Sequence, residues 1–165
     1  MTSAPSFENY TLTQSALMSF EGQTQTSQQD NVVKITADKV KVSGTADGES
    51  MELTFEGVEA TAQKGAYEQV FLALLDKFEN FTYDEENDLY TNPETITVNV
   101  QMVSMGTPLN VQIAMQNGKV KLNDDGKLLS FVCDYKQTTA TPDGTYVMNT
   151  VMNWAFSDYG TTVID

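Results

Sequence analysis

The sequence predicts an α+β fold: a curved, half-barrel-like antiparallel β-sheet with one main amphipathic helix packed on its apolar face. Three observations lead to this prediction. Apolar and polar residues alternate over most of the chain, which is typical of strands that bury one face. Turn-forming dipeptides such as Asp47-Gly48 and Asp125-Gly126 separate the alternating segments. A single segment, residues 65–81, has the three- and four-residue spacing of a helix.

Strands are expected on the N-terminal side of this helix. Residues 10–20 alternate roughly and place Leu12, Ala16, Met18 and Phe20 on one side. The polar residues 21–31 are expected to form a long turn or a hairpin end. Three short strands should follow, with turns at Ala37-Asp38 and Asp47-Gly48. Their apolar residues are Val33 and Ile35, then Val40 and Val42, then Met51, Leu53 and Phe55.

The expected helix runs from Gly65 to Phe81. Its apolar residues recur at helical spacing, whereas Glu68, Gln69 and Asp76 fall on the other side. Since no second long helix is available as a partner, the apolar stripe must cover the sheet or line a pocket. The stripe consists of Tyr67, Val70, Phe71, Leu74, Leu75, Phe78 and Phe81.

The rest of the chain is expected to be β-structure. A tyrosine-flanked acidic turn or short hairpin comes first, and two alternating strands at residues 96–102 and 109–116 follow it. Asn117-Gly118 is the strongest hairpin signal in the chain, so a turn is expected there. Further strands follow, with a turn at Asp125-Gly126 and a loop at residues 141–144. The last strand carries Tyr146, Met148, Met152, Trp154 and Phe156 on one side.

Length and composition limit the possible functions. The 165 residues suit a single domain spanning 1–165, and the formal net charge of −14 favours solubility and argues against binding to nucleic acid or an anionic membrane. The chain has no histidine, and its one cysteine, Cys133, lies in an apolar run that predicts a buried side chain. We therefore assign no cofactor, and expect no enzyme, although a hydrolase based on two carboxylates stays open.

The acidic segment around Asp84, Glu86 and Asp88 has the alternate spacing of a calcium-binding loop. However, Leu89 stands where such a loop needs glycine, and Thr95 stands where it needs a bidentate glutamate. A solvated turn is the simpler interpretation. Neither a metal ligand nor a catalytic residue is assigned.

One helix is small compared with the sheet that it has to cover. A helix of about sixteen residues covers roughly 24 Å by 10 Å, whereas six strands make a sheet about 29 Å wide. Either the sheet curls around the helix, or part of its apolar face is left for a ligand. The candidate ligand-binding residues, chosen by the face that they occupy, are Phe71, Leu75 and Phe78 of the helix and Met148, Met152 and Trp154 of the last strand.

The two ends of the chain, "FENYTLTQSALMSF" and "MNWAFSDYGTTVID", resemble bacterial extracytoplasmic half-barrel lipoproteins of the lipoprotein-carrier type (LolA, LolB and LppX-like). The resemblance covers about a fifth of the chain and implies a curved sheet with a helix on its concave side, an apolar cavity for acyl chains and a cell-envelope location. The family's N-terminal helix is missing or truncated in this sequence and no lipobox cysteine is present, and whether a signal peptide or lipid anchor preceded Met1 stays open. Contact with a membrane is expected only through such an anchor.

The leading hypothesis is a secreted or envelope-tethered bacterial domain that binds a lipid or another apolar or amphiphilic ligand between the sheet and the helix. The alternative is a non-catalytic interaction or structural module in which the same side chains form a fully packed core. The two hypotheses differ in whether a cavity separates the helix from the sheet.

Overall fold

The computed structural model describes residues 9–104 and 106–165, except for the side chains of residues 74, 75 and 102–104. An α-helix, α1 (Gly57–Asp76), is followed by a short 3-10 helix, η1 (Phe78–Asn80). The strands are β1 (Tyr10–Phe20), β2 (Thr26–Ile35), β3 (Lys39–Ala46), β4 (Glu49–Glu56), β5 (Thr82–Asp84), β6 (Leu89–Asn92), β7 (Ile96–Ser104), β8 (Thr107–Leu122), β9 (Leu128–Thr141) and β10 (Gly144–Ser157).

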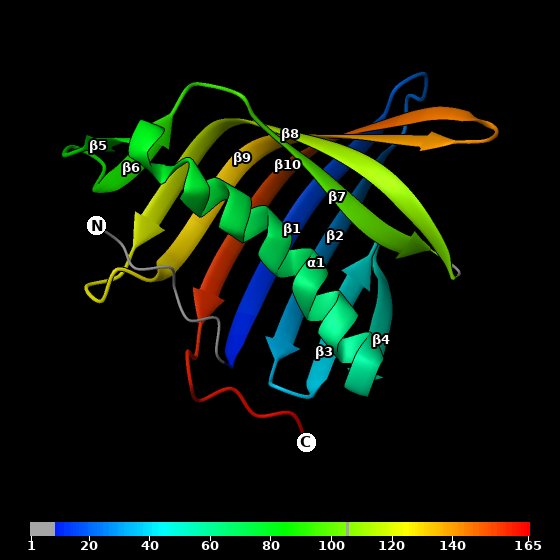
Figure 1. Cartoon of the computed structure of the whole chain (residues 1–165), viewed down its shortest axis with the longest axis horizontal. Coiled ribbons are helices and arrows are strands. Elements are labelled where there is room, and N and C mark those ends of the chain that lie inside the picture. Colours follow the sequence, from blue (N-terminus) through cyan, green and yellow to red (C-terminus); the bar gives the residue numbers. More distant parts are fainter. Residues whose placement is uncertain (1–8, 105) are drawn as a thin grey trace.

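All of these strands belong to one antiparallel sheet. Its order is β4-β3-β2-β1-β10-β9-β8-β6-β5, and β7 pairs with β8 beside this path. The first strand therefore lies next to the last one in the middle of the sheet, as the blue and red strands of Figure 1 show. The prediction of a mainly antiparallel sheet with a single helix is confirmed for the described residues.

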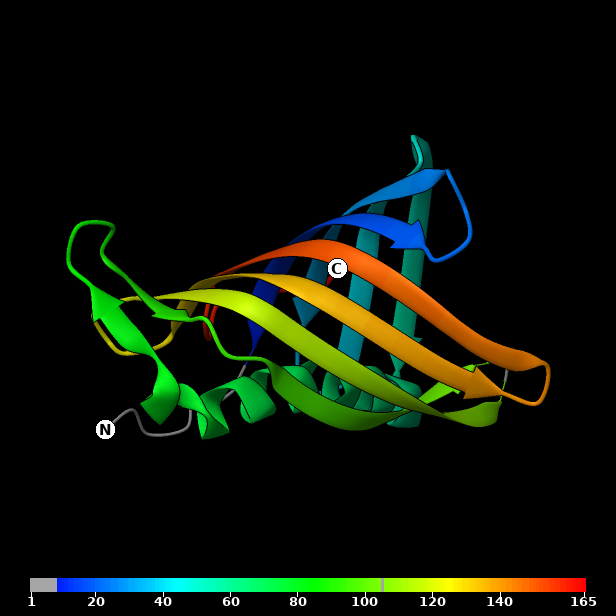
Figure 2. The same cartoon turned by 90° about the horizontal axis from the view of Figure 1, so that it is seen from above.

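The sheet is open and curled. In Figure 2 the strands arch over α1, which runs along the inside of the curve. The Phe71 ring of α1 contacts two rings of β10, with centroid distances of 5.3 Å to Trp154 and 4.9 Å to Phe156. We call the side of the sheet that carries these two residues the inner face.

Most of the predicted strands and turns are confirmed, but the turn at residues 21–31 is too long. Strand β2 begins at Thr26, so its first six residues pair with β1 although they are all polar. Hydrogen bonds to the turn between β3 and β4 fix the other edge of this polar segment. The Asp47 carboxylate accepts hydrogen bonds from the Gln28 backbone N–H and the Ser27 hydroxyl, both at 2.8 Å. A polar strand has no apolar alternation, which is why the pattern missed it.

The helix is shifted from the predicted residues 65–81. It begins at Gly57, where a φ of 57° ends β4, and it stops at Asp76. Residues 58–64 contain good helix formers such as Ala60 and Gln63 but no apolar periodicity, so spacing alone could not detect them. The helix is also less cleanly amphipathic than predicted, because Val58 and Leu72 are exposed on its surface.

The predicted turn at Asn117-Gly118 is wrong. Both residues lie inside β8, which advances from Gln116 to Lys119 while its partner β9 advances only from Asp134 to Val132. This single extra residue is a β-bulge, and Asn117 takes its left-handed conformation there, with φ 54°. Asn117 has the positive φ that makes Asn-Gly a turn signal, but here it forms a bulge. A turn does not form because β8 pairs with neighbouring strands on both sides.

The core lies between α1 and the inner face. Its largest fully buried side chains include Tyr10 and Leu12 of β1, Phe71 of α1 and Phe131 of β9. Cys133 is buried on the inner face as predicted, and burial raises the pKa of its thiol to about 12.

Candidate functional site

The inner face changes character halfway along its central strands. Tyr10 and Leu12 of β1 are fully buried, whereas the next inward position on β1 is Gln14. We call the two parts the packed half (Tyr10, Leu12, Val33, Ile35 and Phe156) and the pocket half (Gln14, Ala16, Gln29, Asn31 and Thr150). The strand register places apolar residues beside apolar ones and polar residues beside polar ones: Leu12 pairs with Val33, and Gln14 pairs with Asn31.

A pocket of about 260 Å³ lies between α1 and the pocket half. Four strands contribute to it, and the register brings together residues that are far apart in the sequence. Ala16 of β1, for example, pairs with Gln29 on one side and with Met152 on the other. The lining residues are Gln14, Ala16, Met18, Gln29, Gln63, Ala66, Tyr67, Val70, Phe71, Tyr135, Gln137, Met148, Met152 and Trp154.

The indole of Trp154 is held in place by aromatic neighbours. It stacks on Phe131 at 5.1 Å between centroids, with an interplanar angle of 25°, and it meets the edges of Phe71 and Tyr135. Edge-to-face and offset-stacked contacts of this kind fix ring orientation. Trp154 therefore presents a rigid wall to the pocket, while Met148 and Met152 next to it have flexible side chains.

The polar part of the lining consists of the four glutamine amides and two tyrosine hydroxyls, and no charged residue is among the residues that line the pocket. Some of these amides have only weak partners. The Gln14 Nε2 group donates to the Met152 sulfur at 3.3 Å, and thioethers are poor acceptors. Burial raises the pKa of Tyr67 and of Tyr135, so both hydroxyls stay neutral.

Four buried polar atoms have no hydrogen-bond partner within the described part of the chain, and one of them, Nε1 of Trp154, belongs to the pocket lining. The others, Oγ1 of Thr150, Oδ1 of Asn31 and Nδ2 of Asn92, belong to residues outside that lining. A buried donor or acceptor without a partner costs roughly 1–3 kcal/mol, so each such atom in a folded protein requires a reason. The unpaired indole N–H of Trp154 thus offers a hydrogen-bond donor at the wall of the pocket.

The predicted site residues are only partly brought together. Phe71, Met148, Met152 and Trp154 line the same pocket. Phe78 does not line it, because it lies beyond the end of α1 and contacts Phe81 at 5.5 Å and Tyr90 at 4.8 Å between centroids. The side chain of Leu75 lies outside the described residues.

The glutamines of the pocket were missed by sequence reasoning. Gln14 and Gln29 each occupy an inward position, two residues from Leu12 and from Asn31. The available signal was therefore a polar residue at a position where alternation predicts an apolar one. Tyr146, which was predicted on the apolar side of the last strand, lies near the start of β10, is 57% exposed and does not line the pocket.

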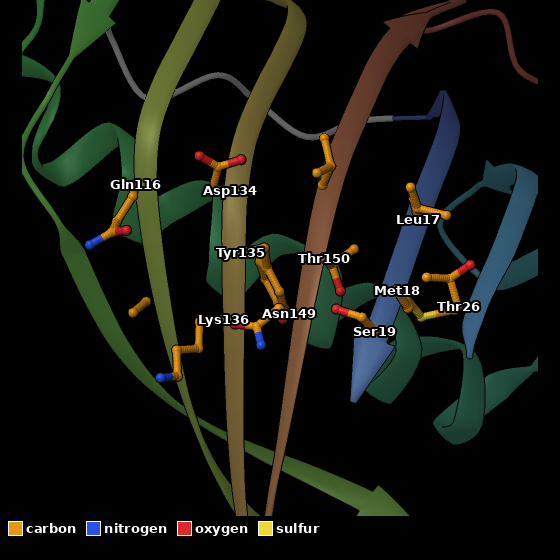
Figure 3. Close-up of a pocket in the computed structure, with 12 residues that line it drawn as sticks. Leu17, Met18, Ser19, Thr26, Gln116, Asp134, Tyr135, Lys136, Asn149 and Thr150 are labelled. Carbon is orange, nitrogen blue, oxygen red and sulfur yellow. The ribbon is translucent and has the colours of Figure 1, made fainter. Parts of the chain in front are cut away.

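A second depression, of about 450 Å³, lies on the outer face and crosses β8, β9, β10 and β1 (Figure 3). Its charged groups already have partners. The Asp134 carboxylate accepts a hydrogen bond from Asn117 Nδ2 at 2.7 Å, and Lys136 pairs with Glu21 at 3.6 Å. Its apolar side chains, Leu17 and Val151, are about half exposed. The charged groups of the outer depression are thus already paired, and its apolar side chains Leu17 and Val151 are less enclosed than those of the inner pocket.

The acidic turn that suggested calcium is closed by its own hydrogen bonds. Asp84 accepts hydrogen bonds from the backbone N–H of Glu86 and from the side chain of Asn87, and these bonds lower its pKa. Over the ranges that the structure describes, no three or more acidic or cysteine side chains form a group that could hold a metal ion.

Comparison with models of known protein families and with the sequences of curated proteins finds no match for this chain. In the described part of the chain, no helix combines the length and the apolar character needed to span a membrane.

Proposed function

We propose that this protein binds a small amphiphilic ligand in the pocket between α1 and the sheet. In this proposal the curled sheet acts as a half-barrel, with α1 packed over its apolar face and the pocket half left for the ligand. The observation that supports it is the composition of the lining: aromatic and methionine walls with a few neutral polar groups. Ligand sites usually have this composition, mainly apolar with a small number of polar groups that orient the ligand.

The volume limits what fits. At about 30 Å³ per water molecule, 260 Å³ corresponds to roughly nine waters, or a ligand of about ten non-hydrogen atoms. A long acyl chain does not fit this volume unless Met148 and Met152 adopt other rotamers. A short amphiphile, or one end of a longer molecule, is thus the better match.

The alternative, an interaction module with a fully packed core, fits the packed half but not the pocket half. In such a core the side chains of α1 and the inner face exclude solvent, and buried polar groups pair with one another. The pocket and the unpaired indole N–H of Trp154 in its wall favour ligand binding instead.

A cell-envelope location, with the protein secreted or held by a lipid anchor, belongs to the same proposal. Its support is the resemblance of the two chain ends to lipoprotein-carrier-like half-barrels.

The test uses Trp154, the single tryptophan of the chain, as the reporter. Titration with octan-1-ol is expected to change the Trp154 fluorescence in a saturable way and to raise the melting temperature. A ligand at 100 times its Kd stabilises the folded state by about 2.7 kcal/mol. Native mass spectrometry of the purified protein, paired with organic extraction, identifies any small molecule that copurifies.

Two alanines of α1 provide a matched pair of variants. Ala66 lines the pocket, whereas Ala62 is exposed on the same helix. Ala66→Phe is expected to fill the pocket and abolish the fluorescence response, while Ala62→Phe keeps it. An unchanged response in folded Ala66→Phe, or no response in the wild-type protein to octan-1-ol or to any extracted molecule, contradicts the proposal.

A further inference from the structure

We infer that the pocket selects ligands whose polar end is uncharged and both donates and accepts hydrogen bonds, such as a hydroxyl or amide group, over anionic ligands of the same chain length. The inference rests on the proposed function and specifies the ligand class for the same pocket. The glutamine amides of the lining suit such a polar end, because each one offers two N–H donors and one carbonyl acceptor.

The pocket has nothing that would balance a negative charge. Its polar lining consists of Gln14, Gln29, Gln63, Gln137 and two tyrosines, and no lysine is among the lining residues. A carboxylate or phosphate placed there would lose its water without gaining a cation, which is costly in an apolar surrounding. The same amides can both donate to and accept from a hydroxyl or amide group.

The charges next to the pocket are already engaged. On α1, Lys64 Nζ lies 3.8 Å from the Glu68 carboxylate, and the Tyr10 hydroxyl donates to that carboxylate at 3.5 Å. Neither Lys64 nor Glu68 lines the pocket. An anion that attracted Lys64 would have to separate it from Glu68.

The net charge of the whole chain also disfavours the binding of anionic ligands. Its nine basic residues are all lysines, and the formal net charge is −14. The long-range potential of such a protein opposes the approach of anions and leaves neutral ligands unaffected.

The test compares octan-1-ol with octanoate at pH 8, where the octanoate carboxylate is charged. Both have the same eight-carbon chain, and binding is followed by Trp154 fluorescence and by calorimetry. We expect the wild-type protein to bind octan-1-ol at least about tenfold more tightly than octanoate. Because octan-1-ol also leaves water more readily than octanoate, this ratio needs a comparison within the protein itself.

Two adjacent glutamines of β2 provide that comparison. Gln29 lines the pocket, whereas Gln28 is exposed and bonds to Ser15 and Asp30 outside it. Gln29→Lys and Gln28→Lys add the same charge one residue apart, on opposite faces of the sheet. We expect Gln29→Lys to bind octanoate about tenfold more tightly than the wild-type protein and to lose the preference for the alcohol, while Gln28→Lys keeps the wild-type ratio.

The outcomes separate this inference from the proposed function. If folded Gln29→Lys keeps the wild-type ratio, if both lysine variants shift it equally, or if wild-type protein binds octanoate as well as octan-1-ol, the inference is wrong and ligand binding stands. If wild-type protein binds neither compound, the inference fails, and the proposed function fails with it when no extracted molecule binds either. Should Gln29→Lys not fold, as judged by circular dichroism, Gln137→Lys on β9 gives the same readout from another wall of the pocket.

Discussion

The packed half and the pocket half of the inner face occupy the same strands. The change from one half to the other takes place between two successive inward positions of a strand. On β1, Leu12 is fully buried in the packed half, and Gln14, two residues later, lines the pocket. On β2 the same step leads from Val33 to Asn31. One sheet thus provides a close-packed core at one end and, at the other, a pocket whose apolar walls carry several neutral amides.

The comparison separates stability from binding. Side chains of the packed half lose nearly all their contact with water, which is the main source of folding free energy. The pocket half includes neutral amides and buried polar atoms without partners, which cost free energy in the ligand-free protein. We therefore expect substitutions in the packed half to affect folding, and substitutions in the pocket half to affect ligand binding.

The largest expected effect is the loss of stability on truncating a side chain of the packed half. Leu12→Ala should lower the free energy of unfolding by about 2–5 kcal/mol, because it leaves a cavity in a close-packed region. Met148→Ala, at the edge of the pocket, should cost only about 1 kcal/mol. Urea denaturation of both variants measures the difference. Equal costs would mean that the two halves are equally well packed.

The next effect concerns the bulge in β8, which lies close to the packed side chains Phe81 and Phe131. A Cβ at Gly118 would lie 3.4 Å from the Phe81 ring. Asn117→Val should lower the free energy of unfolding by about 1–2 kcal/mol, because a β-branched residue does not tolerate the positive φ of this position.

Asn117→Gly is the control for the bulge. It loses the same hydrogen bond to Asp134 but accepts the positive φ, so its stability should stay within about 0.5 kcal/mol of the wild-type value. Thermal unfolding compares the two variants. If they are equally destabilised, the hydrogen bond and not the backbone conformation holds the bulge.

A smaller effect of opposite sign is expected in the pocket half. Gln14→Leu should raise the free energy of unfolding by up to about 1 kcal/mol, because it removes an amide whose hydrogen bond goes to a thioether. It should also weaken binding of octan-1-ol about tenfold through the lost polar contact. Thr13→Leu, the exposed neighbour on the other face, serves as the control. Unchanged binding by Gln14→Leu would show that the amides do not contact the ligand.

The smallest expected effect is a pH dependence at the border of the two halves. Burial raises the pKa of Glu68 from its ordinary value of 4.5, opposed by Lys64 and Tyr10. Since the folded protein holds this proton more tightly than the unfolded chain, Glu68 contributes stability below pH 4.5 and loses it as the pH rises through the raised pKa. Relative to Glu68→Gln, which stays neutral, wild-type protein should become less stable from pH 4 to pH 7. Urea denaturation at both values tests this, and a difference of the opposite sign would contradict the role of burial.

Local patterns predicted a large part of the fold. The alternation around Leu12, Val33 and Trp154 identified strands and their inner face, because the side chains of a strand point alternately to its two sides. Asp47-Gly48 and Asp125-Gly126 marked real turns. The polar start of β2 and the first turns of α1 were missed, because neither has an apolar pattern. Of the residues chosen by face, Phe71, Met148, Met152 and Trp154 line the pocket, whereas Phe78 packs elsewhere.

The sequence by itself determined that the chain forms one-sided strands with a single helix, because spacing and turn chemistry act over a few residues. Only the tertiary structure decided that β1 lies beside β10, which brings Gln14 to Met152, 138 residues away. Only the tertiary structure also made Asn117-Gly118 a bulge instead of a turn, since strands on both sides hold β8 extended. Both features depend on pairing across the whole sheet. That pairing brings Gln14, Gln29 and Gln137 of three strands together near Trp154, and α1 adds Gln63 to the same pocket.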